Sequence, residues 1–431
     1  MINPRKGLAV SLAVSMLAAS LTAQVRIVPI ASGLAKNQVN AVIFRKNSVT
    51  SFRGKQYAAY YDPDSNVVVA KRDLSSTEWM ITKTGFTGDT RDAHNSISIA
   101  IDGKGYLHLA WGNHNTKLNY ARSAKPETPE FVRTAMVGEK EDRVSYPEFY
   151  SMPNGDLVFL YRDGASGNGD LVLNRFESKT ARWSRVQDKL IDGERTRNAY
   201  PQIAVDRKGA IHISWVWRET PDVATNHDLC YARSDDGGKT WRRSNGETYQ
   251  LPITEATAEY IWKIPQNSEL INQTSMTADE SGRPYIATYW RNADSNVPQY
   301  RVVYSDGKEW RMSQVGARKT PFTLSGGGTK RIPISRPQIL VDGKRVIVIF
   351  RDAERGSRIS AAVCSGVPGC EWSFRDLNET NVGMWEPTFD QELWRQTRAV
   401  HLFVQKVGQG DGENLEDIQP QLVSILEWRP Q

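Results

Sequence analysis

Seven times along this 431-residue chain, a glycine-containing or polar turn is followed by a short apolar strand that ends in a charged or amide side chain. The strands expected after these turns cover residues 56–61, 106–111, 157–162, 211–215, 285–290, 346–350 and 400–404. A unit that recurs in this way cannot bury its apolar face alone and must stack on its neighbours. The pattern therefore predicts a repeat protein.

The spacing between these turns selects blades over a solenoid. Successive turns lie roughly 50 to 70 residues apart, which suits a four-stranded antiparallel propeller blade and exceeds most solenoid repeats. In the fourth unit, four strands are expected at 201–205, 211–215, 229–233 and 240–242. We therefore predict an all-β fold, a seven-bladed β-propeller of four-stranded antiparallel blades, formed as a single domain by residues 24–431.

One turn of the fourth unit carries a full Asp-box. Residues 234–241 read SDDGGKTW and match the pattern S-x-D-x-G-x-T-W. Asp236 is expected to bond its own turn, and Trp241 to pack between blades. This motif is typical of propellers of the sialidase-like type, which include hydrolases, lyases and binding modules, so it specifies fold and leaves the chemistry open.

The composition of the chain indicates where the protein is located and which partners it can bind. Residues 1–23 have a basic start, an apolar run and small residues near Ala23, a pattern that predicts a cleaved signal peptide and a periplasmic or secreted protein. No other stretch approaches the ~20 apolar residues of a membrane span. The 55 basic and 49 acidic residues are too evenly matched to indicate nucleic acid, although a local basic surface for an anionic glycan stays open. A monomer is expected.

The three cysteines leave at least one thiol unpaired. Cys364 and Cys370 bracket a five-residue loop that a disulfide could close in an oxidising compartment. Cys230 follows His227 by three residues and lies one strand from His212, which suggests a His/His/Cys metal site. Strand alternation puts residues 227 and 230 on opposite faces and favours the competing interpretation, core packing.

Antiparallel geometry brings four reactive side chains to one rim. The start of a blade's first strand and the end of its second lie on the same face. His94 precedes the expected strand 96–101, and His114 follows strand 106–111 of the same unit. In the next unit, Tyr146 opens the first strand and Arg162 closes the second. We expect these four side chains to converge between neighbouring blades.

Corresponding rim positions carry amides and further arginines, which suit the recognition of sugar hydroxyls and carboxylates. The substrate-binding residues expected from this set are Asn95, Asn115, Tyr200, Arg218, Asn272 and Arg336.

The four central side chains suit β-elimination at a uronic acid. No carboxylate pair stands out as a glycosidase pair, although Glu148 and Asp163 are close in sequence, and no Ser-His-Asp arrangement is indicated. In an elimination, an arginine neutralises the uronate, a base removes the C5 proton and an acid protonates the leaving O4. Tyrosine and histidine are suited to those two transfers.

The blocks 92–99, 105–108, 114–115 and 118–123, with Tyr146-Pro147-Glu148-Phe149 and residues 161–170, resemble the BNR-repeat propeller group of ulvan lyases and rhamnosyl-glucuronate lyases. The resemblance extends over essentially the whole mature chain. Its most specific elements are the spacing of twenty between the two histidines and of sixteen between Tyr146 and Arg162.

The resemblance implies roles for each residue. Tyr146 would be base and acid, with His94 sharing or replacing the base role, Arg162 would neutralise the uronate, and His114 would assist. The implied substrate is an anionic uronate-containing polysaccharide, cleaved at rhamnose-α-1,4-glucuronate or iduronate linkages of ulvan or arabinogalactan-type glycans. No organic cofactor is implied. A structural metal ion, calcium or zinc, is implied, which returns weight to His212, His227 and Cys230.

Two other function classes stay open. A glycoside hydrolase is one, either a sialidase-like enzyme in which Arg218, Arg291 and Arg351 mimic an arginine triad, or an α-L-rhamnosidase like one branch of the same group. That branch uses a histidine near the first blade, where this chain reads Phe44-Arg45-Lys46-Asn47-Ser48. A non-catalytic glycan-binding propeller is the other.

Overall fold

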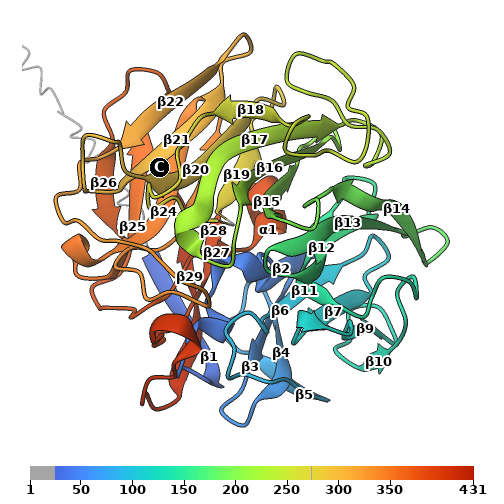
Figure 1. Cartoon of the computed structure of the whole chain (residues 1–431). Coiled ribbons are helices and arrows are strands. Elements are labelled where there is room, and N and C mark those ends of the chain that lie inside the picture. The colour runs from blue at the N-terminus through green and yellow to red at the C-terminus, as the bar shows by residue number, and fades with distance from the viewer. Residues whose placement is uncertain (1–24, 273) are drawn as a thin grey trace, which may run out of the picture.

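The computed structural model describes residues 25–272 and 274–431, so the expected signal peptide lies outside the described residues. These residues form seven antiparallel sheets arranged in a ring (Figure 1). The strands that begin the sheets contact one another around the centre. The predicted seven-bladed propeller is confirmed.

Six sheets follow the order of the sequence. In hydrogen-bonded order they are β2(Val49–Phe52), β3(Lys55–Tyr61), β4(Asn66–Asp73), β5(Met80–Thr87); β6(Ile97–Ile101), β7(Leu107–Trp111), β9(Tyr120–Ser123), β10(Phe131–Arg133); and β8(His114–Thr116), β11(Val144–Ser151), β12(Leu157–Ala165), β13(Asn168–Glu177), β14(Arg182–Ile191). They continue with β15(Asn198–Val205), β16(Ile211–Arg218), β17(Asn226–Ser234), β18(Glu259–Trp262); β19(Ser275–Ala278), β20(Pro284–Trp290), β21(Gln299–Ser305), β22(Trp310–Val315); and β23(Gln338–Asp342), β24(Arg345–Asp352), β25(Arg358–Cys364), β26(Ser373–Asp376).

The seventh sheet joins the two ends of the described chain. Strand β1(Val25–Gly33) pairs with β29(Gln421–Trp428), followed by β28(Val400–Val404) and β27(Thr388–Phe389). Helical segments are short: α1(Gln391–Thr397), η1(Gln38–Asn40), η2(Ile43–Arg45), η3(Val223–Thr225), η4(Ala353–Arg355) and η5(Asp411–Glu413). Among the described residues, no helix has the length and apolar character needed to span a membrane.

All seven strands expected from the repeat pattern exist. Each is the second strand counted from the centre of its sheet, once the three-residue strand β8, which is added beyond β11 in the third sheet, is left out of the count. These strands are mostly apolar, with a few buried polar residues such as His108 and His212, because they lie in the middle of a sheet whose two faces both pack on neighbouring blades. In β7, all five residues are buried. The repeat signal therefore comes from strands that have no solvent-facing side.

The Asp-box turn is built as expected. Asp236 accepts hydrogen bonds from the backbone N–H groups of Lys239 and Thr240 and from the Ser234 and Thr240 hydroxyls. Trp241 is fully buried against residues of the preceding blade. The fourth strand expected at 240–242 is wrong, however, because that segment makes only isolated bridges and β18 fills the position after an insertion.

The cysteines divide as one pair and one free thiol. Cys364 and Cys370 form a disulfide, which closes the loop between them. Cys230 is free and buried in the core between the sheet of β11–β14 and the sheet of β15–β18.

Candidate active site

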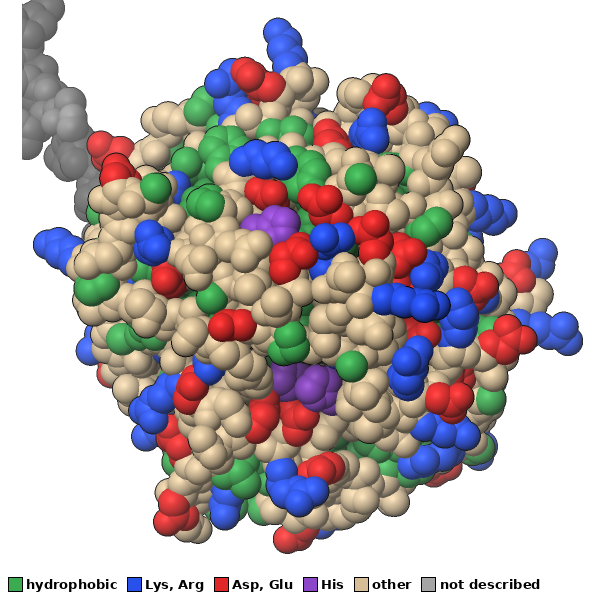
Figure 2. All heavy atoms as spheres, viewed as in Figure 1, with side chains coloured by type: hydrophobic (Ala, Val, Ile, Leu, Met, Phe, Trp, Pro, Cys, Tyr) green, Lys and Arg blue, Asp and Glu red, His purple; other side chains and the backbone are tan. Residues whose placement is uncertain are grey.

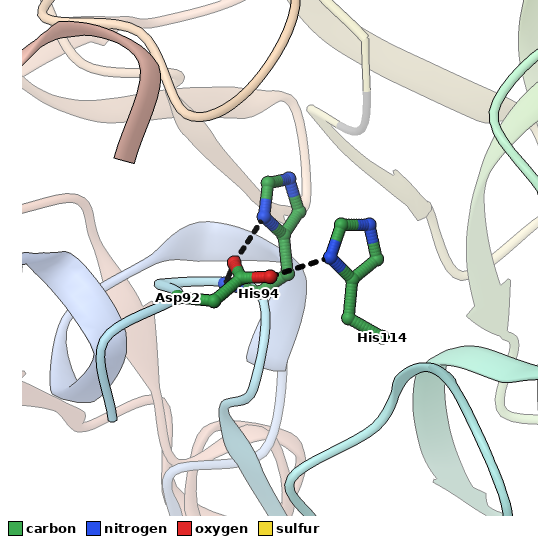
Figure 3. Close-up of side chains that lie close together, drawn as sticks. All are labelled: Asp92, His94 and His114. Atoms are coloured by element: carbon green, nitrogen blue, oxygen red, sulfur yellow. Dashed lines mark hydrogen bonds and ion pairs between the residues drawn. The ribbon is translucent and has the colours of Figure 1, made fainter. Parts of the chain in front are cut away.

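Two histidine rings lie stacked against each other and share one carboxylate. The ring centroids of His94 and His114 are 4.1 Å apart and their planes differ by 17°. Asp92 bonds both rings, with Oδ1 2.6 Å from His94 Nδ1 and Oδ2 2.6 Å from His114 Nδ1. The second nitrogen of each ring points away from Asp92 (Figure 3). Figure 2 shows histidine side chains near the middle of this face, with acidic groups beside them.

Local structure explains how residues twenty apart in sequence meet. The backbone N–H of His94 donates to Asp92 Oδ1, which turns the chain just before β6 begins. His114 lies in β8, a short strand that leaves its own blade and pairs with the next one at Ser145. Because of this crossover, His114 lies beside both its own blade and Tyr146.

A β-bulge sets the position of the Tyr146 side chain. The pairing of β11 with β12 is irregular between Ser145 and Glu148, and Tyr146 has a φ of +55°. Pro147 cannot donate a hydrogen bond to the ladder, so a break at this point is expected. A bulge redirects one side chain, and here it places the Tyr146 ring 5.6 Å from His94 and 6.0 Å from His114.

Arg162 lies directly opposite Ser145 in the β11–β12 pair. Its guanidinium carbon is 5.0 Å from the centroid of the Tyr146 ring. The guanidinium donates to the Ser145 hydroxyl at 3.1 Å and to the Tyr200 hydroxyl at 3.3 Å. The structure thus brings together the four side chains expected at the rim, and adds Tyr200 as a direct neighbour.

The charges of the histidine pair are unequal. Burial alone lowers the pKa of His94, but its bonds to Asp92 and Glu413 outweigh burial and raise it to about 9. Burial lowers the pKa of His114, and the neighbouring positive His94 adds to this effect. The pKa of Asp92 lies well below its usual range, because its bonds to both rings overcome burial. At neutral pH the pair therefore holds one imidazolium, His94, and one neutral ring, His114.

The two tyrosines are also perturbed in opposite directions. Burial and the neighbouring Tyr200 raise the pKa of Tyr146 well above its usual range. Tyr200 is buried too, but Arg162 and Arg218 stabilise its phenolate and lower its pKa to about 7. Tyr146 therefore keeps its proton at neutral pH, while Tyr200 titrates there.

The six expected substrate-binding residues fall into two groups. Tyr200, Arg218 and Asn115 border the central cluster: Arg218 lies 5.5 Å from the Tyr200 ring, and Asn115 is exposed beside His114. Asn95, Asn272 and Arg336 are buried in protein networks. Asn95 donates to a backbone carbonyl, and the Asn226 amide donates to Asn272.

Arg336 lies one layer behind the cluster. Its guanidinium makes a two-pronged ion pair with Glu386 and lies 5.1 Å from the Phe44 ring. Phe44 in turn stacks on His94 at 5.3 Å. Arg336 is thus placed to support the stack, with its charge already paired.

The suggested metal ligands His212, His227 and Cys230 are not brought together. His212 is held between Asp206 and the Tyr231 hydroxyl, and His227 between Glu219 and Asp228. Both rings thus use both nitrogens in hydrogen bonds. Cys230 is buried in the core, and burial raises the pKa of its thiol far above the usual value. This corrects the His/His/Cys interpretation in favour of core packing.

Within the described part of the chain, one group has metal-ligand chemistry: Asp92, His94 and His114, whose donor atoms lie within 4.8 Å of one another. Two imidazoles and a carboxylate suit zinc better than calcium. Each Nδ1 already faces its own oxygen of Asp92, however, as in a hydrogen-bonded His–Asp–His unit. We therefore assign no step to a metal ion at this position.

The arginines suggested as a sialidase triad are engaged by protein groups. Arg218 donates to the carbonyls of Thr220 and Pro221, and Arg291 pairs with Glu269. Arg351 is buried and donates to three backbone carbonyls. Their guanidinium groups serve the structure of the loops.

Four residues of the site were not singled out from sequence. Asp92 links the histidines, Phe44 stacks on His94, and Glu413 and Thr329 lie 3.1 Å and 3.4 Å from His94 Nδ1. Asp92 could have been suspected from its position two residues before His94. The other three come from distant parts of the chain and left no signal near the histidines.

Comparison with known proteins identifies the family. A profile described as "BNR repeat-containing family member" matches residues 55–318. An ulvan lyase of Nonlabens ulvanivorans is 24% identical over 314 residues, which cover 60% of this chain and 64% of the relative. A long-isoform ulvan lyase of an Alteromonas species is 24% identical over 293 residues, covering 54% of this chain and only 29% of that longer relative.

Solved structures share the architecture. The polysaccharide lyase Uly1 superposes with a TM-score of 0.70 at 15% identity, covering 94% of this chain and 99% of that one. A PL25 ulvan lyase bound to -[GlcA(1-4)Rha3S]- superposes with a TM-score of 0.65 at 16% identity, covering 89% and 97%. At such identities the likeness concerns the fold. The profile match extends over more than half of the chain, and the protein therefore belongs to the BNR repeat-containing family.

Proposed function

We propose that the protein is a polysaccharide lyase that cleaves rhamnose-α-1,4-glucuronate or iduronate linkages, in ulvan or arabinogalactan-type glycans, by β-elimination. The observation that carries the proposal is the meeting of a stacked His94–His114 pair, Tyr146 and Arg162 at one rim. The similarity to ulvan lyases supports the same conclusion.

Positive charge at the site suits the first requirement, neutralisation of the uronate carboxylate. Arg162 and the imidazolium of His94 both lie next to Tyr146, 5.0 Å and 5.6 Å from the centre of its ring. Arginine binds a carboxylate through two parallel N–H bonds, and the developing enolate charge is stabilised by the same groups. Neutralising the carboxylate acidifies the C5 proton.

The neutral ring of the pair suits the base role. Asp92 holds the Nδ1–H of His114, which leaves Nε2 as a proton acceptor pointing away from Asp92 (Figure 3). Nε2 takes the C5 proton, the C5–H electrons form the C4–C5 double bond, and the C4–O4 bond breaks. Tyr146 donates its proton to the departing O4.

The raised pKa of Tyr146 favours the acid half of the role that the family resemblance gave it. Its service as base, and the sharing of that role by His94, remain predictions. The reaction as written moves protons and one electron pair, so it requires no organic cofactor.

The test is the ultraviolet absorbance of the unsaturated uronate, measured with ulvan and separately with rhamnose-capped arabinogalactan. Tyr146→Phe and Arg162→Gln should each lower the rate at least 100-fold, while Arg243→Ala, at an exposed ion pair, should match the wild type. Release of free rhamnose without absorbance would refute elimination and favour a hydrolase. Binding without either product would favour a glycan-binding propeller.

We also propose that the protein is exported after removal of residues 1–23. The basic, apolar and small-residue pattern of that segment supports the proposal. Amino-terminal sequencing of protein recovered from the periplasm or medium tests it, and an intact Met1 would refute it.

A further inference from the structure

A short segment lies across the centre of the propeller, next to the histidine pair. We call residues 43–48, which contain η2 and lead into β2, the crossing segment. Phe44 in this segment contacts the site, with its ring centroid 5.3 Å from that of His94 and 5.2 Å from that of Tyr146. All residues of the segment except Asn47 are buried, so it forms part of the protein interior beside the site.

Hydrogen bonds tie the crossing segment to three sheets that lie apart in the ring. The Asn47 amide donates to the Phe149 carbonyl in β11 at 2.5 Å. Lys46 Nζ donates to the Thr274 carbonyl, next to β19, at 2.5 Å, and the Ser48 hydroxyl lies 2.6 Å from a hydroxyl of β27. These strands belong to the third, fifth and seventh sheets (Figure 1). A segment that is bonded to all three crosses the centre of the ring.

A cavity at the centre of the ring is lined by Lys46. The other walls of this cavity are formed by the innermost strands β15, β19, β23 and β27, and by Trp394 and Arg395 of α1. Lys46 is only 4% exposed. An ammonium group therefore lies near the axis of the propeller, away from bulk water.

Oxygen atoms lie around this charge. An ammonium carries three N–H donors, and the Thr274 carbonyl accepts one of them. Glu148 is 2% exposed and attracts the charge of Lys46. Its Oε2 accepts from the Tyr150 hydroxyl, and its Oε1 has no hydrogen-bond partner among the described residues. The buried hydroxyl of Ser275, which lines the same cavity as Lys46, also lacks a partner in the described part of the chain.

Lys46 keeps its charge at neutral pH. Burial lowers the pKa of Lys46 to about 8, and Glu148 and Glu386 limit the fall. Arg336 adds to the lowering, but its own charge is paired with Glu386 at 2.6 Å. Burial raises the pKa of Glu148 to about 7, and Lys46 is the main group that opposes this rise. Since a buried carboxylate is costly without a positive charge nearby, Lys46 acts as the counter-charge of Glu148.

The centre of the propeller does not fit the structural metal ion, calcium or zinc, that the family resemblance implies. Calcium binds six to eight oxygen atoms, but here the oxygens already interact with an ammonium, and a second positive charge beside it would be repelled. Zinc prefers nitrogen and sulfur ligands, and the suggested set of His212, His227 and Cys230 is not brought together.

We propose that the Lys46 ammonium takes the place of a structural metal ion at the centre of the propeller, and that the protein therefore keeps its stability without a bound metal. The ammonium holds the crossing segment on the inner strands, and with it Phe44 beside the histidine pair. This inference goes beyond the proposed lyase function and does not depend on it.

The first experiment measures urea unfolding of the wild type at pH 7.5 after dialysis against a chelator, with and without added calcium or zinc. The urea midpoint should be the same in all these conditions. A midpoint that falls on chelation and is restored by either metal would overturn the proposal. This measurement decides the metal question even where a Lys46 variant does not fold.

The second experiment tests whether Lys46 is the counter-charge of Glu148. Lys46→Met and Glu148→Gln should each lower the urea midpoint, because each leaves a buried charged partner behind. The loss in the double variant should be smaller than the sum of the two single losses. Lys71→Met is the matched control, since Lys71 also donates to a backbone carbonyl but lies away from the centre, and it should change the midpoint little. Single losses that simply add would overturn the counter-charge role.

The third experiment asks whether a metal ion can replace the ammonium. In Lys46→Ala, calcium chloride should raise the urea midpoint above that in choline chloride of the same ionic strength, because the oxygens around the removed ammonium accept a cation. The wild type should show no such difference between the two salts. Equal midpoints of Lys46→Ala in both salts would overturn the view that the ammonium takes the place of a metal ion.

Discussion

Replacing Asp92 with asparagine should make the activity loss depend strongly on pH. His94 has a pKa of about 9 instead of its ordinary 6.5, although burial acts in the opposite direction. The difference corresponds to ~3 kcal/mol at about 1.4 kcal/mol per pKa unit. Asp92 is closer to His94 Nδ1 than Glu413 is, at 2.6 Å against 3.1 Å, so we assign most of this energy to Asp92.

In Asp92→Asn, the pKa of His94 should fall to about its ordinary value, because Glu413 still opposes the effect of burial. At pH 8, the protonated fraction of His94 then falls from about nine tenths to a few per cent, a loss of roughly 30-fold. At pH 6 most of the rings stay protonated in both proteins. The altered bond to His114 lowers the rate at every pH. We therefore expect the loss of rate at pH 8 to exceed the loss at pH 6 by roughly 20-fold.

The stability of the two proteins should diverge in the same pH range. Because the folded pKa of His94 is raised, its contribution is fully present below pH 6.5 and is lost as the pH rises through about 9. The wild type should lose this stability on alkalinisation, and Asp92→Asn should already lack much of it at neutral pH.

The assay combines elimination rates from pH 6 to pH 10 with an NMR titration of the histidine ring protons. Asp235→Asn, at a half-exposed turn, is the matched control and should leave both curves unchanged. Superimposable pH profiles for Asp92→Asn and the wild type, with a His94 titration that stays near pH 9, would refute the reasoning.

Three further predictions concern other parts of the molecule. Ionisation of Tyr200 near pH 7 offsets the charge of Arg162, so KM for the uronate should rise as the pH passes through 7 and stay flat in Tyr200→Phe; a rise that persists would contradict this. Trp241→Ala should lower the free energy of unfolding by about 3 to 5 kcal/mol in a urea titration, because the indole is fully buried, and a change below about 1 kcal/mol would refute its role between blades. Treatment with a chelator should leave the elimination rate unchanged, and a loss restored by zinc would show a metal at Asp92 and the two histidines.

The fold could be predicted because every propeller blade buries its second strand in the same way. The second strand of each sheet is buried on both faces, so it appears in the sequence as a short, mostly apolar run after a turn. Outer strands are half exposed, as in β5, and their pattern is weaker. That difference explains the error at residues 240–242: the long insertion before β18 is invisible to a rule that expects each strand soon after the last.

Part of the site could be predicted from antiparallel geometry alone. The rule that a first strand starts where the second ends placed His94 near His114, and Tyr146 near Arg162. It could not foresee that β8 crosses to the next blade or that a bulge places Tyr146 beside the two histidines. Those features depend on pairing between blades, which local sequence does not encode.

A motif that recurs in two blades explains why the metal-ligand prediction at His212 was wrong. His212 lies between Asp206 and Tyr231, and His108 lies in the same way between Asp102 and Tyr120. In both blades the histidine follows its aspartate by six residues. A histidine that recurs at a fixed offset from a turn aspartate serves the blade, and this comparison within the sequence would have removed it from the metal hypothesis.

Glu413 offers the sharpest test of how distant segments complete the site. Its carboxylate lies 3.1 Å from His94 Nδ1 and accepts from the backbone of Ala93 and Thr329. Glu413→Gln should lower the pKa of His94 less than Asp92→Asn does, because Asp92 remains.

The double variant Asp92→Asn/Glu413→Gln separates a shared role from two independent ones. If both carboxylates act by holding one proton on His94, their effects on its pKa add. The wild-type ring is almost fully protonated at pH 8, so the first lowering of its pKa costs little rate, and each further unit costs about tenfold. The combined loss of rate at pH 8 should therefore exceed the product of the single losses. Losses at pH 8 that simply multiply would contradict this and would mean that Glu413 acts only through its bonds to the backbone of Ala93 and Thr329. Measured from pH 6 to pH 10, the cycle distinguishes the charge on His94 from the bonds that Glu413 makes to the backbone.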